Sequence, residues 1–304
     1  MTQLLNALPG ALAQGLIWGV MAIGVYITYK VLDIADLTVD GSICTGAAMC
    51  TMLLLGGQSP WLALLCAVLA GVLAGAVTGL LHVGLGIPPI LAGILTQMVL
   101  WSVNLKLLGK ANQALPARTT PVLLSQMDVG GALPVLLGFC VVLVALLVLF
   151  FGTELGCALR ATGCNPVMSR AQGVNTGLMK IIGLALSNGV VALSGALLCQ
   201  YQGYTDVNMG RGAVVIGLAA VVIGQAVLGR RGGRMAVQLG GVILGAVIYY
   251  IVYQVIIFAG FDTDLLKMFS AVVVAVFLGA PHVKAQLKAH SRSKKGDSGH
   301  AENE

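Results

Sequence analysis

Long runs of apolar residues, separated by short polar stretches, make up most of this sequence. A helix needs about 20 apolar residues to cross a bilayer, whereas membrane strands would show an alternation that these runs lack. The pattern predicts an all-α integral membrane protein with about nine transmembrane segments, of which the second and seventh are short enough to be half-helices. The approximate bounds are 11–30, 41–56, 61–85, 88–108, 132–151, 178–199, 213–229, 236–259 and 263–280.

The composition supports a membrane protein and argues against a soluble one. Of the 304 residues, 58% are hydrophobic and 9% are charged, and the mean hydropathy is +0.95. A soluble domain is usually about 25% charged. The net charge of +6 comes from thinly spread basic residues without an aromatic and basic patch, so we expect no nucleic-acid partner.

The basic residues also predict the orientation, because cytoplasmic loops of membrane proteins are enriched in Lys and Arg. Placing the loop 152–177 in the cytoplasm assigns twelve basic residues to that side and five to the other. We therefore expect an external N-terminus and a cytoplasmic C-terminus. The cytoplasmic set is Lys30, Arg160, Arg170, Lys180, Arg230, Arg231, Arg234, Lys284, Lys288, Arg292, Lys294 and Lys295, and the external set is Lys106, Lys110, Arg118, Arg211 and Lys267.

Residues 1–281 form a transmembrane domain in this interpretation, and residues 282–304 form a polar tail. The tail is mixed in charge and has too few apolar residues to fold alone, so we expect it to be disordered in the cytoplasm.

Two similar stretches, about 170 residues apart, indicate an internal repeat. Each begins with an aspartate, contains glycine and precedes a short apolar run: DLTVDGS from Asp36 and DVNMGRG from Asp206. The first repeat spans about 11–108 and the second about 178–280, with a linking segment at 132–151. An odd number of crossings between the copies would invert the second, as in many transporters. An interfacial loop with an aspartate N-cap is the alternative explanation of each stretch.

Gly71, Gly75 and Gly79 recur at four-residue spacing in the third apolar segment. This spacing places the three glycines on one stripe of a helix, where another helix backbone can approach closely. We therefore expect a helix-packing surface there.

The loop from Thr153 to Gly177 has the signals of a short, capped helix. Gly163 can end a first helix, Asn165 and Pro166 suit the cap and first turn of a second, and Gly173 can end it in the left-handed conformation. The second helix would cover about two turns, from Pro166 to Gln172. Such a helix fits either a docking element for a partner or an amphipathic helix that lies on lipid.

We find no catalytic or metal-ligating arrangement in the sequence and expect no cofactor. The cysteines form no CxxC pair, and the histidines have no HExxH spacing. A run that begins at Gly224 has Walker-like glycines but lacks the Lys-Ser/Thr pair that binds phosphate and magnesium. Any ATP hydrolysis must therefore come from a separate subunit.

Four motifs resemble the permeases of ATP-binding-cassette (ABC) importers of the branched-chain amino acid and ribose type. They are LGCALRATGCNPVMSRAQGVN, ADLTVDGS, GIPPILAGILT with Pro88 and Pro89, and GRGAVVIGLAAVVIGQAVLGRRGGR. The resemblance covers about residues 11–280 and is closest to permeases of tryptophan or tyrosine import systems. Asp40 departs from the sugar-type pattern, in which a small residue is commoner.

The resemblance implies a multi-pass protein of the bacterial plasma membrane that pairs with a second permease copy as a homodimer. ABC ATPase subunits would dock on the cytoplasmic face, and an extracytoplasmic binding protein would deliver an aromatic or branched-chain amino acid. A secondary transporter or channel is the main alternative, and a membrane enzyme is a further one. The implied coupling residues are Arg160, Gly163, Asn165, Pro166, Arg170, Gly173 and Asn175, and the implied pathway or break residues are Asp36, Asp40, Gly41, Asp206, Gly212, Pro88 and Pro89.

Overall fold

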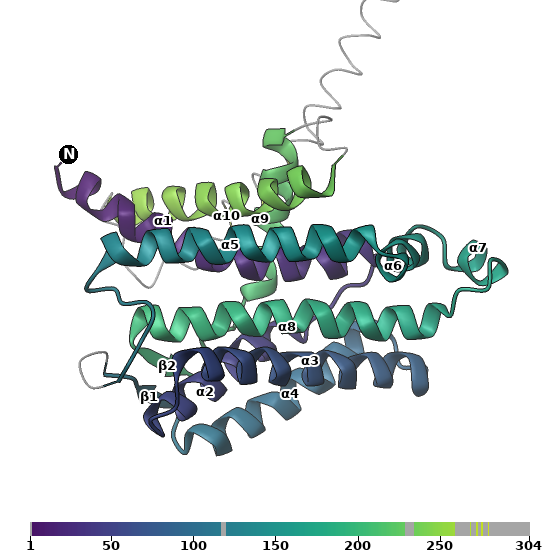
Figure 1. The fold of residues 1–304 in the computed structure, drawn as a ribbon, viewed down its shortest axis with the longest axis horizontal. Helices are drawn as coiled ribbons and strands as arrows, with labels where there is room; N and C mark the ends of the chain where they lie inside the picture. Colours follow the sequence, from purple (N-terminus) through teal and green to yellow (C-terminus); the bar gives the residue numbers. More distant parts are fainter. Residues whose placement is uncertain are drawn as a thin grey trace, which may run out of the picture. The chain divides into compact units, whose positions relative to one another are not determined.

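Helices make up most of the part of the chain that the computed structural model describes, which comprises residues 2–116, 120–228 and 234–258 and positions 268, 272, 275 and 279 (Figure 1). The elements in chain order are α1 (Thr2–Tyr26), the π-helical turn η1 (Ile27–Val31), α2 (Val39–Leu55), α3 (Pro60–Gly84), α4 (Pro89–Leu108), β1 (Asn112–Ala114), α5 (Val129–Gly152), α6 (Glu154–Cys164), α7 (Pro166–Ala171), α8 (Thr176–Gln202), β2 (Tyr204–Asp206), α9 (Ala213–Leu228) and α10 (Met235–Phe258).

Within the described ranges, six helical stretches are long and apolar enough to cross a membrane. They include α3, α4, α5, α8 and α10, together with the α1–η1 stretch from Leu8 to Val31. The helices α2 and α9 are shorter apolar helices, in agreement with the short second and seventh segments of the sequence pattern. The predicted segment at 263–280, the tail from 282, and Arg118, Arg230, Arg231 and Lys267 lie outside the described residues.

The chain separates into two compact units, Met1–Val255 and Ile256–Glu304, and the contacts described below all lie in the first unit. Its centre is α8, which Figure 1 shows between a layer of α1 and α5 and a layer of α2 and α3. In its most apolar stretch, 72% of α8 is buried, against 22% for α5 at the periphery. The core of the bundle is therefore built around α8.

The glycine stripe of α3 packs directly on α8, as the spacing of the stripe predicts. A Cβ atom on Gly71 would overlap the carbonyl oxygen of Asn188, and one on Gly75 would overlap the carbonyl oxygen of Leu184. A Cβ on Gly79 would stand 2.9 Å from the Cα of Ile181. The two backbones therefore lie as close together as only glycine permits.

Hydroxyl groups of α8 fix its antiparallel packing against α1. Ser187 donates a hydrogen bond to the carbonyl oxygen of Gly24, and Ser194 donates one to that of Ile17, each at 2.7 Å. In an apolar surrounding, such bonds satisfy hydroxyls that would otherwise be unpaired.

The turn η1 ends the first span and returns the chain into the bundle. Asp33 has a positive φ of 56°, a left-handed conformation that aspartate tolerates better than most residues. The amide of Ile34 then donates to the carbonyl oxygen of Thr28, and the following residues lead to buried Asp36. The second segment thus begins inside the bundle, next to the middle of α8.

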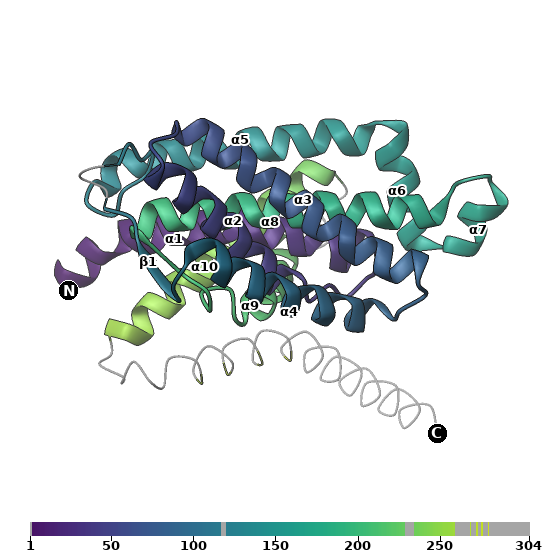
Figure 2. The same cartoon turned by 90° about the horizontal axis from the view of Figure 1, so that it is seen from below.

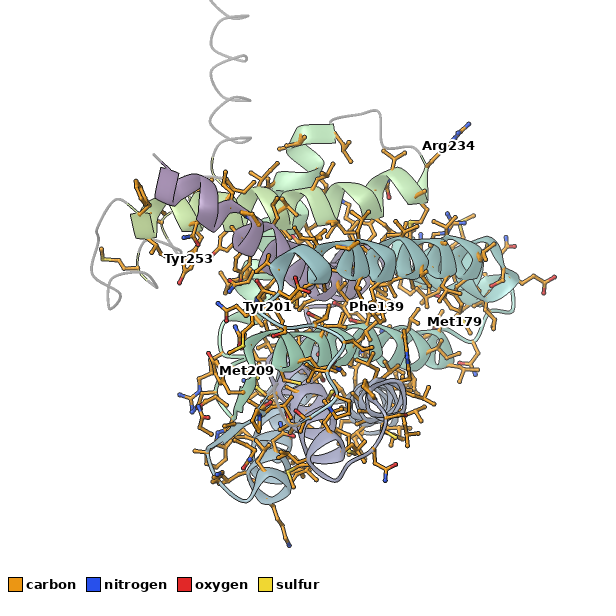
Figure 3. The ribbon with its side chains drawn as sticks, turned by 60° about the vertical axis from the view of Figure 1, so that its left-hand side comes forward. Phe139, Met179, Tyr201, Met209, Arg234 and Tyr253 are labelled. Atoms are coloured by element: carbon orange, nitrogen blue, oxygen red, sulfur yellow. The ribbon has the colours of Figure 1, made fainter. Side chains whose placement is uncertain are left out.

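The two ends of the bundle differ in character. One end carries α6 and α7, and the other carries β1 and β2, which pair antiparallel with Gln113 opposite Thr205 (Figure 2). Figure 3 shows Met179 and Arg234 toward the first end and Tyr201 and Tyr253 toward the second. The sequence pattern indicated no strands, because three-residue strands show no alternation and their pairing is a long-range contact.

Candidate functional site

The starts of the two short helices, α2 and α9, are joined by hydrogen bonds from α9 to Asp40. Asp40, in the first turn of α2, accepts hydrogen bonds from the backbone N–H groups of Gly212 and Val214, each at 3.0 Å. The first N–H groups of a helix have no partner within that helix. Asp40 therefore supplies the start of α9 with a cap from 172 residues earlier in the chain. The sequence predicted both helix starts but not their contact.

The same local turn precedes each of the two short helices. Oδ1 of Asp36 accepts from the N–H of Thr38 at 2.8 Å, and Oδ1 of Asp206 accepts from the N–H of Asn208 at 2.7 Å. Both are aspartate turns that close two residues onward. The position that matches Asp40 in the second stretch is Gly210, and a Cβ there would overlap the carbonyl oxygen of Asp40.

A buried polar network joins α2 to α8 and α3. Asn188 donates to Oδ2 of Asp36 at 2.7 Å and accepts from the hydroxyl of Ser42 at 2.6 Å. The hydroxyls of Thr38 and Thr78 lie 2.8 Å apart. Because Asp36 is buried, these donors satisfy a carboxylate that would otherwise be unpaired in an apolar interior.

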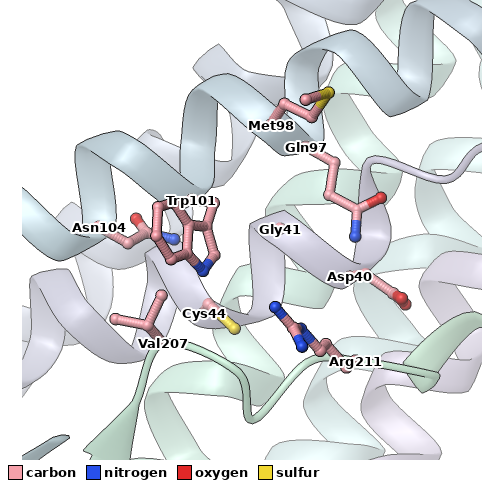
Figure 4. A pocket seen from close by; sticks show the side chains of 9 residues that line it. All are labelled: Asp40, Gly41, Cys44, Gln97, Met98, Trp101, Asn104, Val207 and Arg211. Carbon is pink, nitrogen blue, oxygen red and sulfur yellow. The ribbon is translucent and has the colours of Figure 1, made fainter. Parts of the chain in front are cut away.

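A pocket of about 230 Å³ lies where the start of α2, the segment before α9 and the α4 helix come together (Figure 4). Trp101 and Met98 are largely exposed at its edge, with exposed fractions of 44% and 66%. The pocket is therefore open at the face of α4. Its lining consists of Asp40, Gly41 and Cys44 from α2, Gln97, Met98, Trp101 and Asn104 from α4, and Val207 and Arg211 from the segment before α9.

The lining of the pocket combines polar and apolar groups. Asn104 is 1% exposed, yet neither atom of its side-chain amide has a hydrogen-bond partner in the described part of the chain. Arg211, which the charge pattern assigns to an external loop, lines this pocket together with Asp40. Such a lining can bind a small solute that has both charged and apolar parts.

Of the predicted pathway residues, Asp40 and Gly41 line the pocket, while Asp36, Asp206 and Gly212 adjoin it through the turns and the cap. Pro88 and Pro89 are not part of it. Pro88 precedes α4 and Pro89 is its first residue. Just before them, the carbonyl oxygen of Ile87 lies 2.8 Å from Nδ1 of His82. Nε2 of His82 lies 3.3 Å from the amine of Lys180 in α8. Because Lys180 is near the start of α8, this contact places the two prolines toward the α6–α7 end of the bundle.

The loop from Thr153 to Gly177 contains the short capped helix that its sequence predicts. Oδ1 of Asn165 accepts from the N–H groups of Val167 and Met168, at 3.1 and 3.0 Å, and Pro166 is the first residue of α7. Gly173 follows with φ of 82°, and its N–H donates to the carbonyl of Arg170. The helix ends at Ala171, one residue before the expected end.

Gly163 has a different role from the predicted one. It lies inside α6 and does not end this helix, which continues to Cys164. A Cβ on Gly163 would overlap the carbonyl oxygen of Val31, so the glycine permits close packing of α6 on η1. The helix instead ends where the Asn165-Pro166 pair disfavours a further helical residue.

The remaining residues of this loop fix how α7 joins α8. The side chain of Arg170 donates to the hydroxyl of Thr176 at 2.8 Å, and Asn175 caps α8 through the N–H of Leu178 at 3.1 Å. Arg160 is exposed and donates to the sulfur of Cys157 at 3.3 Å. Val167 and Met168 are 78% and 61% exposed and form an apolar surface on α7. These two side chains can contact a partner surface or lipid.

Comparison with known proteins decides between the classes of membrane protein that this geometry fits. The profile of the family described as "Branched-chain amino acid transport system / permease component" matches residues 8–280. The chain belongs to this permease family. Among the described residues of the permease, no group of three or more His, Cys, Asp or Glu side chains could hold a metal ion.

Several relatives of the permease are known by sequence. A tyrosine transport system permease protein of Clostridioides difficile (strain R20291) is 38% identical over 93% of this chain and 94% of its own length. An uncharacterized protein of Rickettsia prowazekii (strain Madrid E) is 33% identical over 91% of this chain and 98% of its own length. The autoinducer 2 import system permease protein LsrC of Escherichia coli (strain K12 / DH10B) is 30% identical over 66% of this chain and 60% of its own length. No solved structure matches the permease.

Sequence reasoning missed several residues of the permease that the fold brings to the helix starts. Asn188, Thr78 and Asn104 each lie within an apolar segment, where a polar side chain is costly unless it has a partner or a function. That signal alone could have identified them as candidates. Gln97 lies in the same apolar segment as Asn104 and carries the same signal, whereas Trp101 gave none, because it reaches the pocket only through the position of α4.

Proposed function

We propose that this permease is the membrane-spanning subunit of an ABC importer and that it works as a homodimer. ATPase subunits dock on the cytoplasmic face, and an extracytoplasmic binding protein delivers the solute to the other face. The observation that carries this proposal is α7: a short helix that is capped by Asn165, opened by Pro166 and bears exposed Val167 and Met168 at one end of the bundle. A capped helix of this kind presents a rigid apolar surface to a motor subunit.

The proposed orientation places the α6–α7 end in the cytoplasm and the N-terminus outside. Basic residues support it, because Lys30, Arg160, Arg170, Lys180 and Arg234 belong to elements or junctions near this end, and cytoplasmic ends are enriched in such residues. In this orientation the residues before α2 enter the bundle from the cytoplasmic side, and those before α9 enter from the external side.

Two inverted repeats follow from that arrangement as part of the proposal. The matched aspartate turns at Asp36 and Asp206 and the short helices that follow them support it. Broken helices of inverted repeats commonly frame the substrate site of a transporter, near the midplane of the membrane. The pocket between α2, α4 and the start of α9 accordingly forms part of the transport pathway.

The transported solute is an amino acid in this proposal, with an aromatic or branched side chain. The support is the family description and the tyrosine transport relative, which covers nearly the whole chain. ATP-driven closure of the motor subunits would rock the two permease copies between inward-open and outward-open states.

Reconstitution tests the class of transporter. The permease is placed in proteoliposomes, first alone and then with its cognate ATPase and binding protein, and uptake of L-tyrosine is measured. We expect uptake only with both partners and ATP. Uptake by the permease alone, driven by an ion gradient, would instead establish a secondary transporter or channel.

Replacement of the α7 cap tests the docking surface. We expect the double change N165A/P166A to leave membrane insertion intact but to abolish the stimulation of ATPase activity by transport. The pair Ser59 and Pro60 begins α3 in the same way, with Ser59 accepting from the N–H of Leu62, so S59A/P60A is the matched control. If N165A/P166A transports at the rate of the control, α7 is not the docking element.

A further inference from the structure

The side chain of Asn104 is the least explained polar group in this part of the bundle. It is 1% exposed, it lines the pocket, and neither its Nδ2 nor its Oδ1 atom has a hydrogen-bond partner in the described part of the chain. Burying an amide without partners is unfavourable, and nearly all buried polar side chains have a partner. A residue that keeps this cost in the empty protein indicates a ligand that supplies the missing bonds.

Residues that share a face of α4 with Asn104 form one wall of the pocket. Gln97, Trp101 and Asn104 follow at spacings of four and three residues, so their side chains project from the same side of the helix. Figure 4 shows Trp101 and Gln97 on this wall, facing α2. Met98 and Val207 add apolar surface. This wall offers two primary amides beside a large aromatic ring.

The opposite wall carries a positive charge next to a carboxylate whose oxygens already accept hydrogen bonds. Both carboxylate oxygens of Asp40 already accept from the start of α9, which compensates part of its negative charge. The guanidinium group of Arg211 forms no hydrogen bond or ion pair with another residue in the described ranges, and Figure 4 shows it directed into the pocket over Cys44. A guanidinium group binds a carboxylate through paired hydrogen bonds.

We propose that this pocket is a binding site within the permease for a single small L-amino acid with an uncharged, aromatic or branched side chain. The solute carboxylate pairs with Arg211, its amino group donates to the amide oxygen of Asn104, and its side chain contacts Trp101 and Met98. The site rests on the proposed function as a transporter and adds the part of the pathway that recognises the solute. It gives the permease its own selectivity, in addition to that of a binding protein.

The size and charge of the pocket favour an amino acid over other solutes. At about 230 Å³ it is smaller than the pockets of about 300–1,000 Å³ that hold drug-sized ligands. A sugar has no carboxylate for Arg211 and no side chain for the apolar wall.

Binding to the purified permease, without ATPase or binding protein, tests the site directly. The full chain is placed in nanodiscs, and L-tyrosine, L-tryptophan, L-leucine and D-ribose are titrated while heat of binding and thermal unfolding are followed. We expect at least one of the amino acids to bind and D-ribose not to bind. Absence of binding by all three amino acids at millimolar concentration overturns the proposal.

The variant Asn104→Leu separates a role in binding from a structural role. Because leucine has a similar size and no unpaired amide, we expect N104L to unfold at a higher temperature when empty but to bind the amino acid about tenfold more weakly. Ser102 lies on the exposed side of the same helix, so S102L is the matched control and should bind normally. An unchanged affinity in N104L contradicts the proposal.

Arg211 is tested by removing the group that it is expected to bind. We expect R211Q to weaken L-tyrosine binding by about tenfold or more, because a charged hydrogen bond is lost. Tyramine lacks the carboxylate, so its weaker binding should be the same in R211Q and in the unmodified protein. Equal loss for both ligands would show that Arg211 supports the pocket without contacting the carboxylate, and would overturn the assignment.

The binding site and the importer function can fail separately. Amino-acid binding that depends on Asn104 and Arg211, without any ATP-dependent uptake, would support the site and contradict the importer. Normal ATP-dependent uptake by N104L and R211Q, at L-tyrosine concentrations below saturation, would support the importer and contradict the site.

Discussion

Asp40 has two tasks that its place in the sequence does not reveal. It belongs to the first turn of α2, and it caps α9 through Gly212 and Val214. A local cap contributes about 1 kcal/mol to stability. Loss of this one also leaves the partly buried N–H group of Val214 unpaired, at a further cost that would be about 1–3 kcal/mol if the group were fully buried. A single carboxylate therefore connects the two short helices.

Replacing Asp40 should be more damaging than replacing an ordinary cap. Asp128 caps α5 at an exposed site, through the N–H of Gly131 at 3.0 Å. We expect D128A to lower stability by about 1 kcal/mol and D40A to lower it by about 2 kcal/mol or more. Thermal unfolding of the two purified variants in the same detergent measures the difference. Equal destabilisation would mean that the bonds from Asp40 to α9 add nothing beyond a local cap.

Among the elements, α3 and α8 form the closest pair, because glycine removes the side chains between them. The stripe Gly71, Gly75 and Gly79 lets the two backbones touch, and no side-chain rearrangement can relieve an added methyl group. Overpacking of such a contact costs about 1–3 kcal/mol.

The same substitution at two glycines of α3 separates packing from helix propensity. A Cβ on Gly75 would overlap the carbonyl of Leu184, whereas one on Gly84 has nothing within 4 Å. We expect G75A to unfold at a clearly lower temperature than the unmodified protein and G84A to unfold at the same or a slightly higher one, because alanine favours a helix. If G75A is as stable as G84A, α3 and α8 do not touch through their backbones in the membrane.

At the scale of the whole molecule, the orientation in the membrane depends on which end carries α6 and α7. Of the seven cysteines, four are buried and Cys66 is half-buried in the apolar helix α3, whereas Cys157 and Cys164 on α6 are exposed. A thiol reacts with maleimide only where its thiolate meets water. Labelling of Cys157 and Cys164 therefore shows on which side of the membrane the α6–α7 end lies.

We expect a membrane-impermeant maleimide to label the permease in inside-out vesicles and not in intact cells. The double variant C157S/C164S should lose the label in both preparations, which identifies the reactive thiols. Labelling of intact cells that disappears in the double variant would place α6 and α7 outside, and would overturn both the orientation and the proposed docking of ATPase subunits.

Much of the helix pattern could be predicted because its cause is local. Apolar runs of sufficient length specify α3, α5 and α8, and the residues Asn165, Pro166 and Gly173 specify α7 through their own backbone preferences. Gly163 was assigned wrongly because glycine suits both a helix end and a close contact, and only the position of Val31 distinguishes the two.

The candidate site could be predicted only in part because its contacts are distant in sequence. The sequence identified Asp36, Asp40 and Asp206 as starts of short helices, but the bond from Asp40 to Gly212 joins residues 172 positions apart. Asn104 and Arg211 became candidates only because both line the pocket between α4 and the segment before α9. No local sequence pattern predicts that these two segments lie together.

The connection between α7 and α8 determines where a force applied at the α6–α7 end would act. Arg170 ties α7 to the first residue of α8, and the glycine stripe packs α8 on α3, so these three helices are joined by direct contacts. Half-way along α8, Asn188 forms hydrogen bonds with Asp36 and Ser42 at the start of α2. Under the proposed function, a displacement of α7 would pass along α8 to Asn188 and from there to the start of α2, which lines the pocket through Asp40 and Gly41.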